Sequence, residues 1–108
     1  MIPINIEPVN VKVSQALSER MTEMFEGIDR YNDLAVNADL YLKSHPESDT
    51  EEKEVSIRLN MPGKDIFISK QGADFSSAAQ ELHDALKVAL RKHKDMHKNK
   101  HKTNPGKF

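Results

Sequence analysis

The sequence contains no cysteine and no long apolar run. Without cysteine, the chain can form no disulfide, no thiolate nucleophile and no cysteine-based zinc site. No apolar run approaches the roughly 20 residues that a membrane-spanning helix requires. The first residues, MIPINIEPVNV, also lack the basic start and unbroken apolar segment of a signal peptide. We therefore expect a cytoplasmic protein that does not contact a membrane and whose core is held by packing alone.

The charge of the chain is small in total but unevenly distributed. The 108 residues suit one domain, and their net charge is only −1. Residues 87–108 carry eight bases against one acid, a net charge of +7, whereas residues 1–86 carry eight bases against sixteen acids, a net charge of −8. A basic end on an acidic body indicates a polyanionic partner. The alternative is a solvated tail that only aids solubility.

Hydrophobic periodicity predicts the order β-α-β-β-β-α. Alternating apolar residues predict strands at about 2–6, 36–43, 55–59 and 66–68, and a Pro62-Gly63 turn joins the last two as a hairpin. Helical spacing predicts a first helix at about 14–30, capped by Ser14. A second helix follows Gly72, with Asp74 or Ser76 as its cap. The fold class is α+β: a two-layer sandwich with a four-stranded sheet and two helices packed on one face.

The second helix presents two different faces in projection. At about 100° per residue, its apolar residues from Phe75 to Met96 fall within one arc that we expect to pack on the sheet. Four bases gather within roughly 60° of one another on another side: Lys87, Arg91, Lys94 and Lys98. They would form a ridge about 16 Å long, comparable to a few phosphate steps of a nucleic acid.

Three histidines at four-residue spacing, His93, His97 and His101, raise the question of a metal site. His93 projects into the edge of the apolar arc, where we expect it to be packed. No carboxylate or cysteine completes a ligand set, and Asn99, Asn104 and Pro105 predict that the helix ends soon after Lys98. We therefore expect no metal and no cofactor, and we divide the chain into a domain at 1–98 and a basic flexible tail at 99–108.

The chain resembles the ribosome hibernation-promoting factor family, which includes ribosome-associated inhibitor A and is also labelled the sigma-54 modulation protein family. The resemblance covers about residues 2–98. It is carried by the element order, by a glycine-x-aspartate-aromatic turn at Gly72, Asp74 and Phe75, and by the basic run LRKHKD at 90–95. The resemblance is to the short form of that family, so we expect no second domain.

The resemblance implies a non-enzymatic function. A protein of this family enters the small ribosomal subunit in the channel used by mRNA and tRNA, blocks initiation and stabilises inactive ribosomes in stress or stationary phase. Its partners would be the small subunit and its rRNA, with a second hibernation factor as a further candidate and no small-molecule substrate. The implied rRNA contacts are Lys87, Arg91, Lys92, Lys94 and Lys98, which would bind phosphate rather than read bases.

The first helix departs from the pattern of the resembled family, whose members commonly carry bases there. In this chain, acids outnumber bases on that helix: Glu19, Glu23, Glu26 and Asp29 stand against Arg20 and Arg30. This departure predicts weaker contacts with rRNA on the side of the first helix. It favours the hypothesis that the protein binds ribosomes with lower affinity or needs a partner factor.

Two other kinds of function stay open from the sequence. Tyr41, Arg58 and Phe67 are predicted to point away from the helices, so that the open sheet face could stack the bases of a general RNA or DNA ligand. The second possible function is that of a transcription modulator that binds only a protein. Catalysis is not expected, because His45, Asp49, Glu51 and Glu52 lie in one solvated loop and lack the fixed geometry that acid-base chemistry requires.

Overall fold

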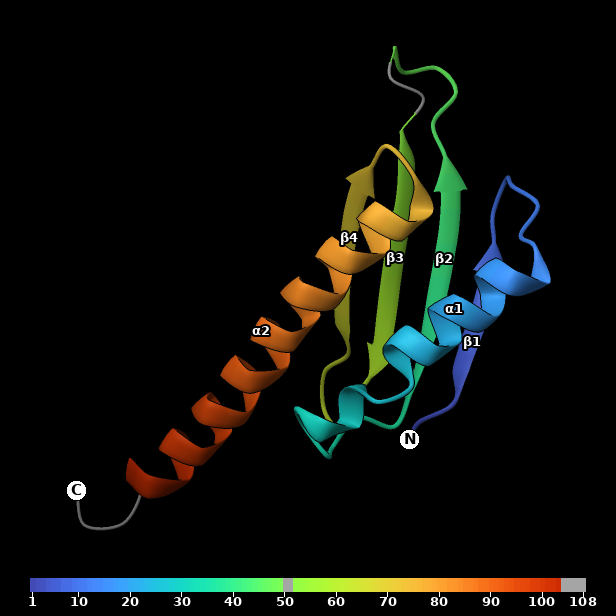
Figure 1. Cartoon of the computed structure of the whole chain (residues 1–108). Coiled ribbons are helices and arrows are strands. Elements are labelled where there is room, and N and C mark those ends of the chain that lie inside the picture. The colour runs from blue at the N-terminus through green and yellow to red at the C-terminus, as the bar shows by residue number, and fades with distance from the viewer. Residues whose placement is uncertain (50–51, 104–108) are drawn as a thin grey trace.

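The computed structural model describes the backbone of residues 1–49 and 52–103 and the side chains of residues 1–49 and 52–93. Within these residues the elements follow in the predicted order (Figure 1). They are β1 (Ile4–Pro8), α1 (Gln15–Phe25), the 3-10 helix η1 (Ile28–Arg30), β2 (Asn37–Ser44), β3 (Lys53–Asn60), β4 (Ile66–Gly72) and α2 (Phe75–Thr103).

The described strands form one mixed sheet in the order β1-β2-β3-β4. The crossover through α1 makes β1 parallel to β2, whereas the shorter connections make β2, β3 and β4 antiparallel. The turn between β3 and β4 contains Gly63 with a φ of 87°, a conformation that glycine adopts without steric cost. The predicted Pro62-Gly63 hairpin is thus confirmed.

One face of the sheet carries the core. Alternate residues of β2 and β3 are fully buried beneath the helices, among them Leu40, Leu42 and Ile57. α1 packs over β1, α2 packs over β3 and β4, and both helices lie on this same face (Figure 1). The predicted two-layer α+β fold, with two helices on one face of a four-stranded sheet, is confirmed.

The prediction of one continuous first helix at 14–30 is wrong. Ser14 does cap α1, since its hydroxyl accepts a hydrogen bond from the Leu17 N–H at 3.1 Å, but the helix ends at Phe25. Gly27, a poor helix former, separates α1 from η1. A Cβ at position 27 would lie 2.6 Å from the Arg30 guanidinium, which folds back so that Nε donates to the Gly27 carbonyl at 3.0 Å. The break therefore gives Arg30 a fixed position.

The prediction that the second helix ends soon after Lys98 is also wrong, because α2 continues to Thr103. Asn99 is a weak helix former but does not break a helix, and the lysines around it favour one. The stronger signal is Pro105, which disfavours helical geometry only at the residue before it. The C-terminal part of α2 extends beyond the sheet (Figure 1). The boundary between a domain and a tail near residue 98 stays a prediction.

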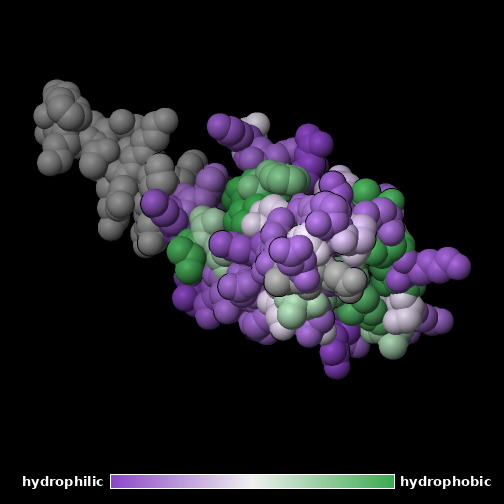
Figure 2. Space-filling view, turned by 90° about the horizontal axis from the view of Figure 1, so that it is seen from above, coloured by the Kyte–Doolittle hydropathy of each residue, from purple (hydrophilic) through white to green (hydrophobic). Residues whose placement is uncertain are grey.

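The face of the molecule that is seen from above is mainly hydrophilic (Figure 2). Seen from above, hydrophobic groups occupy small, separate areas (Figure 2). The described helices include none that is long and apolar enough to cross a membrane.

Candidate nucleic-acid interface

The start of α2 is built by the glycine-x-aspartate-aromatic turn. Asp74 caps the helix, because its Oδ1 accepts the Ser77 N–H at 2.7 Å, and this hydrogen bond lowers the pKa of Asp74. A Cβ on Gly72 would lie 3.1 Å from the backbone nitrogen of Ala78, so glycine lets the helix start close to the end of β4. Of the two predicted caps, Asp74 is confirmed. The turn thereby fixes the rotation of α2 about its axis.

That rotation buries one side of α2 and exposes another. Its buried residues follow the helical period: Ala78, Ala79, Leu82, Leu86 and Leu90. On the adjoining side, toward η1, lie Lys87 and Arg91, one turn apart. The apolar face thus packs α2 on the sheet, and Lys87 and Arg91 lie beside Tyr31, directly after η1.

The ring of Tyr31, directly after η1, is contacted by three cationic side chains. The Cζ of Arg91 lies 5.3 Å, the Nζ of Lys87 5.5 Å and the Cζ of Arg30 5.7 Å from the ring centroid. These distances are within the range of cation–π contacts, which offset part of the repulsion among the three charges. We call Arg30, Tyr31, Lys87 and Arg91 the Tyr31 cluster. It joins two parts of the chain that are more than 50 residues apart in sequence.

Two further residues, His83 and Asn32, hold the Tyr31 cluster in place. The ring of His83 meets Phe25 and Tyr31 edge to face, at centroid distances of 5.6 Å and 6.1 Å. Asn32 is buried, and its Nδ2 lies 3.4 Å from the Leu90 carbonyl and 3.2 Å from His93 Nδ1. Because buried amides need such partners, Asn32 ties the segment after η1 to α2. His93 is packed here, as the sequence predicts.

The charges of the Tyr31 cluster are available to a ligand. Among the side chains that the structure describes, none of the three cations is ion-paired with a carboxylate. Arg30 and Arg91 are exposed, and Lys87 is partly exposed. Uncompensated cations that are held close together by packing form a site suited to phosphate groups.

The predicted site residues fall into three groups. Lys87 and Arg91 are brought together. Lys92 is exposed but lies about 100° around the helix from Arg91, on the other flank of α2. The side chains of Lys94 and Lys98 lie outside the described residues. The structure therefore brings Lys87 and Arg91 together, and the rRNA-binding role of all five residues stays a prediction.

Arg30 and Tyr31 are the site residues that the sequence did not identify. Counted along the predicted first helix, Arg30 was one of two bases among four acids, whereas in the structure it lies in η1 with its Cζ 5.7 Å from the centroid of the Tyr31 ring. In the sequence, Gly27 followed three residues later by the pair Arg30-Tyr31 is the signal that could have indicated the Tyr31 cluster.

The open sheet face is a weaker candidate. Arg58 donates from Nε to Asp65 at 3.3 Å, so its charge is already compensated. Phe67 is 63% exposed and stands opposite Arg58 in the register, whereas Tyr41 stands opposite Ser56. The two aromatic residues are thus on strands separated by β3 and do not form one continuous stacking platform.

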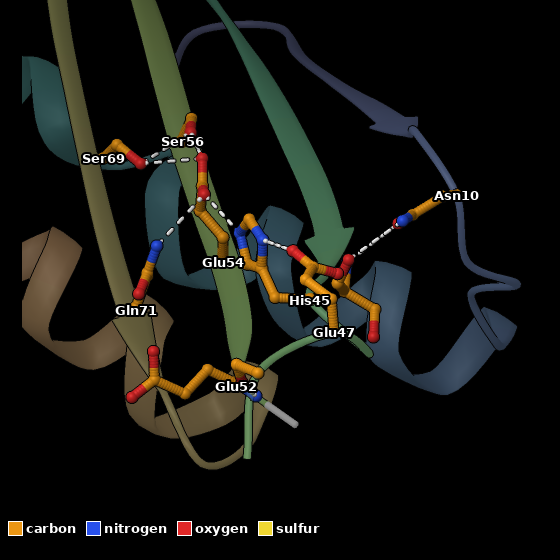
Figure 3. A network of polar contacts seen from close by, with 10 residues as sticks. Asn10, His45, Glu47, Glu52, Glu54, Ser56, Ser69 and Gln71 are labelled. Carbon is orange, nitrogen blue, oxygen red and sulfur yellow. Dashed lines mark hydrogen bonds and ion pairs between the residues drawn. The ribbon is translucent and has the colours of Figure 1, made fainter. Parts of the chain in front are cut away.

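A second polar network lies at the far end of the sheet (Figure 3). His45 places Nε2 2.7 Å from Glu54 Oε1 and Nδ1 3.2 Å from Glu47 Oε1. Glu54 also accepts hydrogen bonds from Ser56, Ser69 and Gln71. The expectation that this loop lacks fixed geometry is wrong for His45. Neither ring nitrogen is left for a metal, and no metal-binding group of three ligands is found among the described residues.

Replacing His45 with glutamine should make the stability of the protein less dependent on pH. The bond to Glu54, followed by that to Glu47, raises the pKa of His45 above 6.5, and the bond to His45 is the main cause that lowers the pKa of Glu54 from 4.5 to about 2. Protonated His45 therefore stabilises the fold fully below pH 6.5, and this stabilisation is lost as the pH rises through its raised pKa. Ionised Glu54 stabilises the fold fully above pH 4.5, and this stabilisation is lost as the pH falls toward 2.

The difference in melting temperature between wild type and His45→Gln should therefore be largest between about pH 4.5 and 6.5. It should shrink steadily toward pH 9. Thermal unfolding followed by circular dichroism measures both proteins across this range. A difference that does not change with pH would contradict the role of the His45 imidazolium.

The model of the family described as sigma 54 modulation protein / S30EA ribosomal protein matches residues 4–98. The chain belongs to this family. The resemblance that the turn at 72–75 and the LRKHKD run indicate is confirmed, and almost all the described residues lie within the match.

Curated S30EA relatives carry hibernation names. The ribosome hibernation promoting factor of Escherichia coli K12 is 33% identical over 92 residues, which are 85% of this chain and 93% of that protein. The ribosome hibernation promotion factor of Deinococcus radiodurans is 31% identical over 86 residues, 79% of this chain. This second match spans only 45% of the Deinococcus protein.

Solved structures agree with the fold. The N-terminal domain of Protein Y from Thermus thermophilus aligns with a TM-score of 0.73 at 18% identity and covers 86% of this chain and 99% of that one. A ribosomal subunit interface protein from Coxiella burnetii aligns with a TM-score of 0.72 at 21% identity, covering 87% and 99%. At these identities the alignments show a shared α+β fold.

Proposed function

We propose that the protein binds the small ribosomal subunit near its decoding region through the Tyr31 cluster and stabilises inactive ribosomes in stress or stationary phase. The observation that carries this proposal is the convergence of Arg30, Lys87 and Arg91 on one ring. Membership of the S30EA family and the hibernation names of the relatives support it. Inhibition would follow from occupancy, and no catalytic step is required.

The Tyr31 cluster suits RNA phosphate better than base edges. Arginine can bind phosphate oxygens in a bidentate manner, and lysine adds a point charge. Three cations held together beside α2 can contact adjacent phosphates, so the folded shape of the RNA would select the site. Lys92, Lys94 and Lys98 would add phosphate contacts along α2, and a second hibernation factor is a further proposed partner.

The proposal is tested by the distribution of the protein on sucrose gradients. In lysates of stationary-phase cells, an antibody against the protein should detect it in the fractions of small subunits and intact ribosomes. It should be depleted from the light fractions. Confinement of the whole pool to the light fractions at low salt would contradict the proposal.

Replacing both Tyr41 and Phe67 with serine should change the affinity for small subunits by less than about threefold. The reason is that the open sheet face presents compensated charge and separated aromatic residues, whereas stacking on a true platform is worth about 1–3 kcal/mol per base. A binding titration with labelled protein measures the effect. A loss of tenfold or more in a folded double variant would favour the sheet face as the RNA platform.

A further inference from the structure

His83 lies beside the Tyr31 cluster without belonging to it. It is partly buried on α2, one turn before Lys87, and its ring fits between those of Phe25 from α1 and Tyr31. The proposed binding of phosphate by the cluster does not require it. A titratable ring placed between two aromatic rings and next to several cations can nevertheless respond to any anion that binds them.

The charged groups around His83 come from α2 and η1. Burial is the largest cause that lowers the pKa of His83, the charge of Asp84 raises it, and the charges of Lys87 and Arg30 lower it further. α1 contributes the uncharged ring of Phe25, and the ring of Tyr31 also contacts the imidazole. The net direction is downward from 6.5, so the ring is mainly neutral in the free protein at neutral pH.

A bound polyanion changes two of these influences at once. Phosphate groups on Lys87 and Arg30 compensate the charges that oppose protonation of His83, and they add negative charge a short distance away. Both effects stabilise the imidazolium form. Because linkage is reciprocal, a protein that takes up a proton when it binds an anion also binds that anion more tightly once it is protonated.

We propose that His83 takes up a proton when RNA phosphate binds the Tyr31 cluster, so that a fall in pH strengthens the binding. This inference rests on the proposed function and adds a means of regulating the same site. Each unit by which bound RNA raises the His83 pKa tightens binding by up to about tenfold as the pH falls through the two values.

The direct test is an NMR titration of the wild-type protein, free and saturated with a short A-form RNA duplex. The ring Cε1–H signal of His83 is assigned by its absence from the spectrum of His83→Gln. We expect the pKa of His83 to be higher in the complex. An equal or lower pKa in the complex overturns the proposal, and so does a failure of the duplex to bind at all.

Affinity measurements separate this proposal from the proposed function. Wild type, His83→Gln and the control His45→Gln, whose side chain lies at the far end of the sheet, are titrated with small ribosomal subunits at pH 6 and pH 8. The ratio of the two dissociation constants should be several-fold larger for wild type and the control than for His83→Gln. Equal ratios in all three proteins overturn the proton coupling, whereas an absence of subunit binding in every protein refutes the proposed function and leaves the NMR titration to decide the coupling.

Discussion

Reversing Arg30, Lys87 and Arg91 to glutamate should lower the affinity for small ribosomal subunits by roughly 100-fold or more at physiological salt. Each reversal removes a cation that is not ion-paired to a described carboxylate and places a negative charge against RNA phosphate. All three side chains are exposed or partly exposed, so the fold should persist. Co-sedimentation and a fluorescence titration measure the loss, and circular dichroism checks the fold.

The salt dependence of binding gives the same test a second readout. Each phosphate contact contributes about 0.7–0.9 to the slope of log affinity against log salt. The magnitude of the slope should therefore fall by about 2 to 3 in the triple variant. An unchanged slope would mean that these three cations do not contact phosphate.

A matched control reverses three lysines near the opposite end of the sheet from the Tyr31 cluster: the exposed Lys12 and Lys43 and the partly exposed Lys53. This variant has the same change in net charge as the triple variant of the cluster. We expect its affinity to stay within about fivefold of wild type, because long-range repulsion is screened beyond about 8–10 Å. Equal losses in the two variants would show that total charge, and not the cluster, governs binding.

Replacing Phe25 with alanine should lower the free energy of unfolding by about 3–5 kcal/mol. Phe25 is fully buried at the end of α1, and its ring packs against His83. Alanine would leave a cavity at the junction of α1 and α2 and remove one side of the support for His83. For a domain of this size, the melting temperature should fall by more than about 10 °C.

Thermal and urea unfolding measure this effect against two controls. Phe25→Leu, which keeps most of the apolar volume, should cost clearly less than the alanine substitution. Val88→Ala should change stability by no more than about 0.5 kcal/mol, because Val88 is 65% exposed on α2. A cost of less than 1 kcal/mol for Phe25→Ala would show that the α1–α2 junction is not packed as described.

The sequence predicted the fold well because its periodicities are strong. Strand alternation identified β2, β3 and β4 and their burial, and the turn at Gly72 and Asp74 located the start of α2. Both errors concern where helices end. The apolar pattern of the first helix continues past Gly27, although α1 itself ends at Phe25. Pro105 disfavours the helical conformation at the residue before it and so allows α2 to continue to Thr103.

Of the Tyr31 cluster, the sequence predicted only the two residues that lie on one helix. Lys87 and Arg91 lie on one helix, so their common side follows from spacing alone. Arg30 and Tyr31 come from another part of the chain, and the folding of α1 and α2 onto the same sheet face brings them to Lys87 and Arg91. The His45 network depends in the same way on the pairing of β2 with β3. Contacts of this kind are set by tertiary structure.

The most direct test of the central claim is a structure of the protein bound to the small ribosomal subunit, determined by electron cryo-microscopy. Our account predicts that Arg30, Lys87 and Arg91 lie within hydrogen-bond distance of rRNA phosphate oxygens, with the open sheet face turned away from that contact. A complex in which Tyr41 and Phe67 stack on bases while the Tyr31 cluster faces solvent would contradict it.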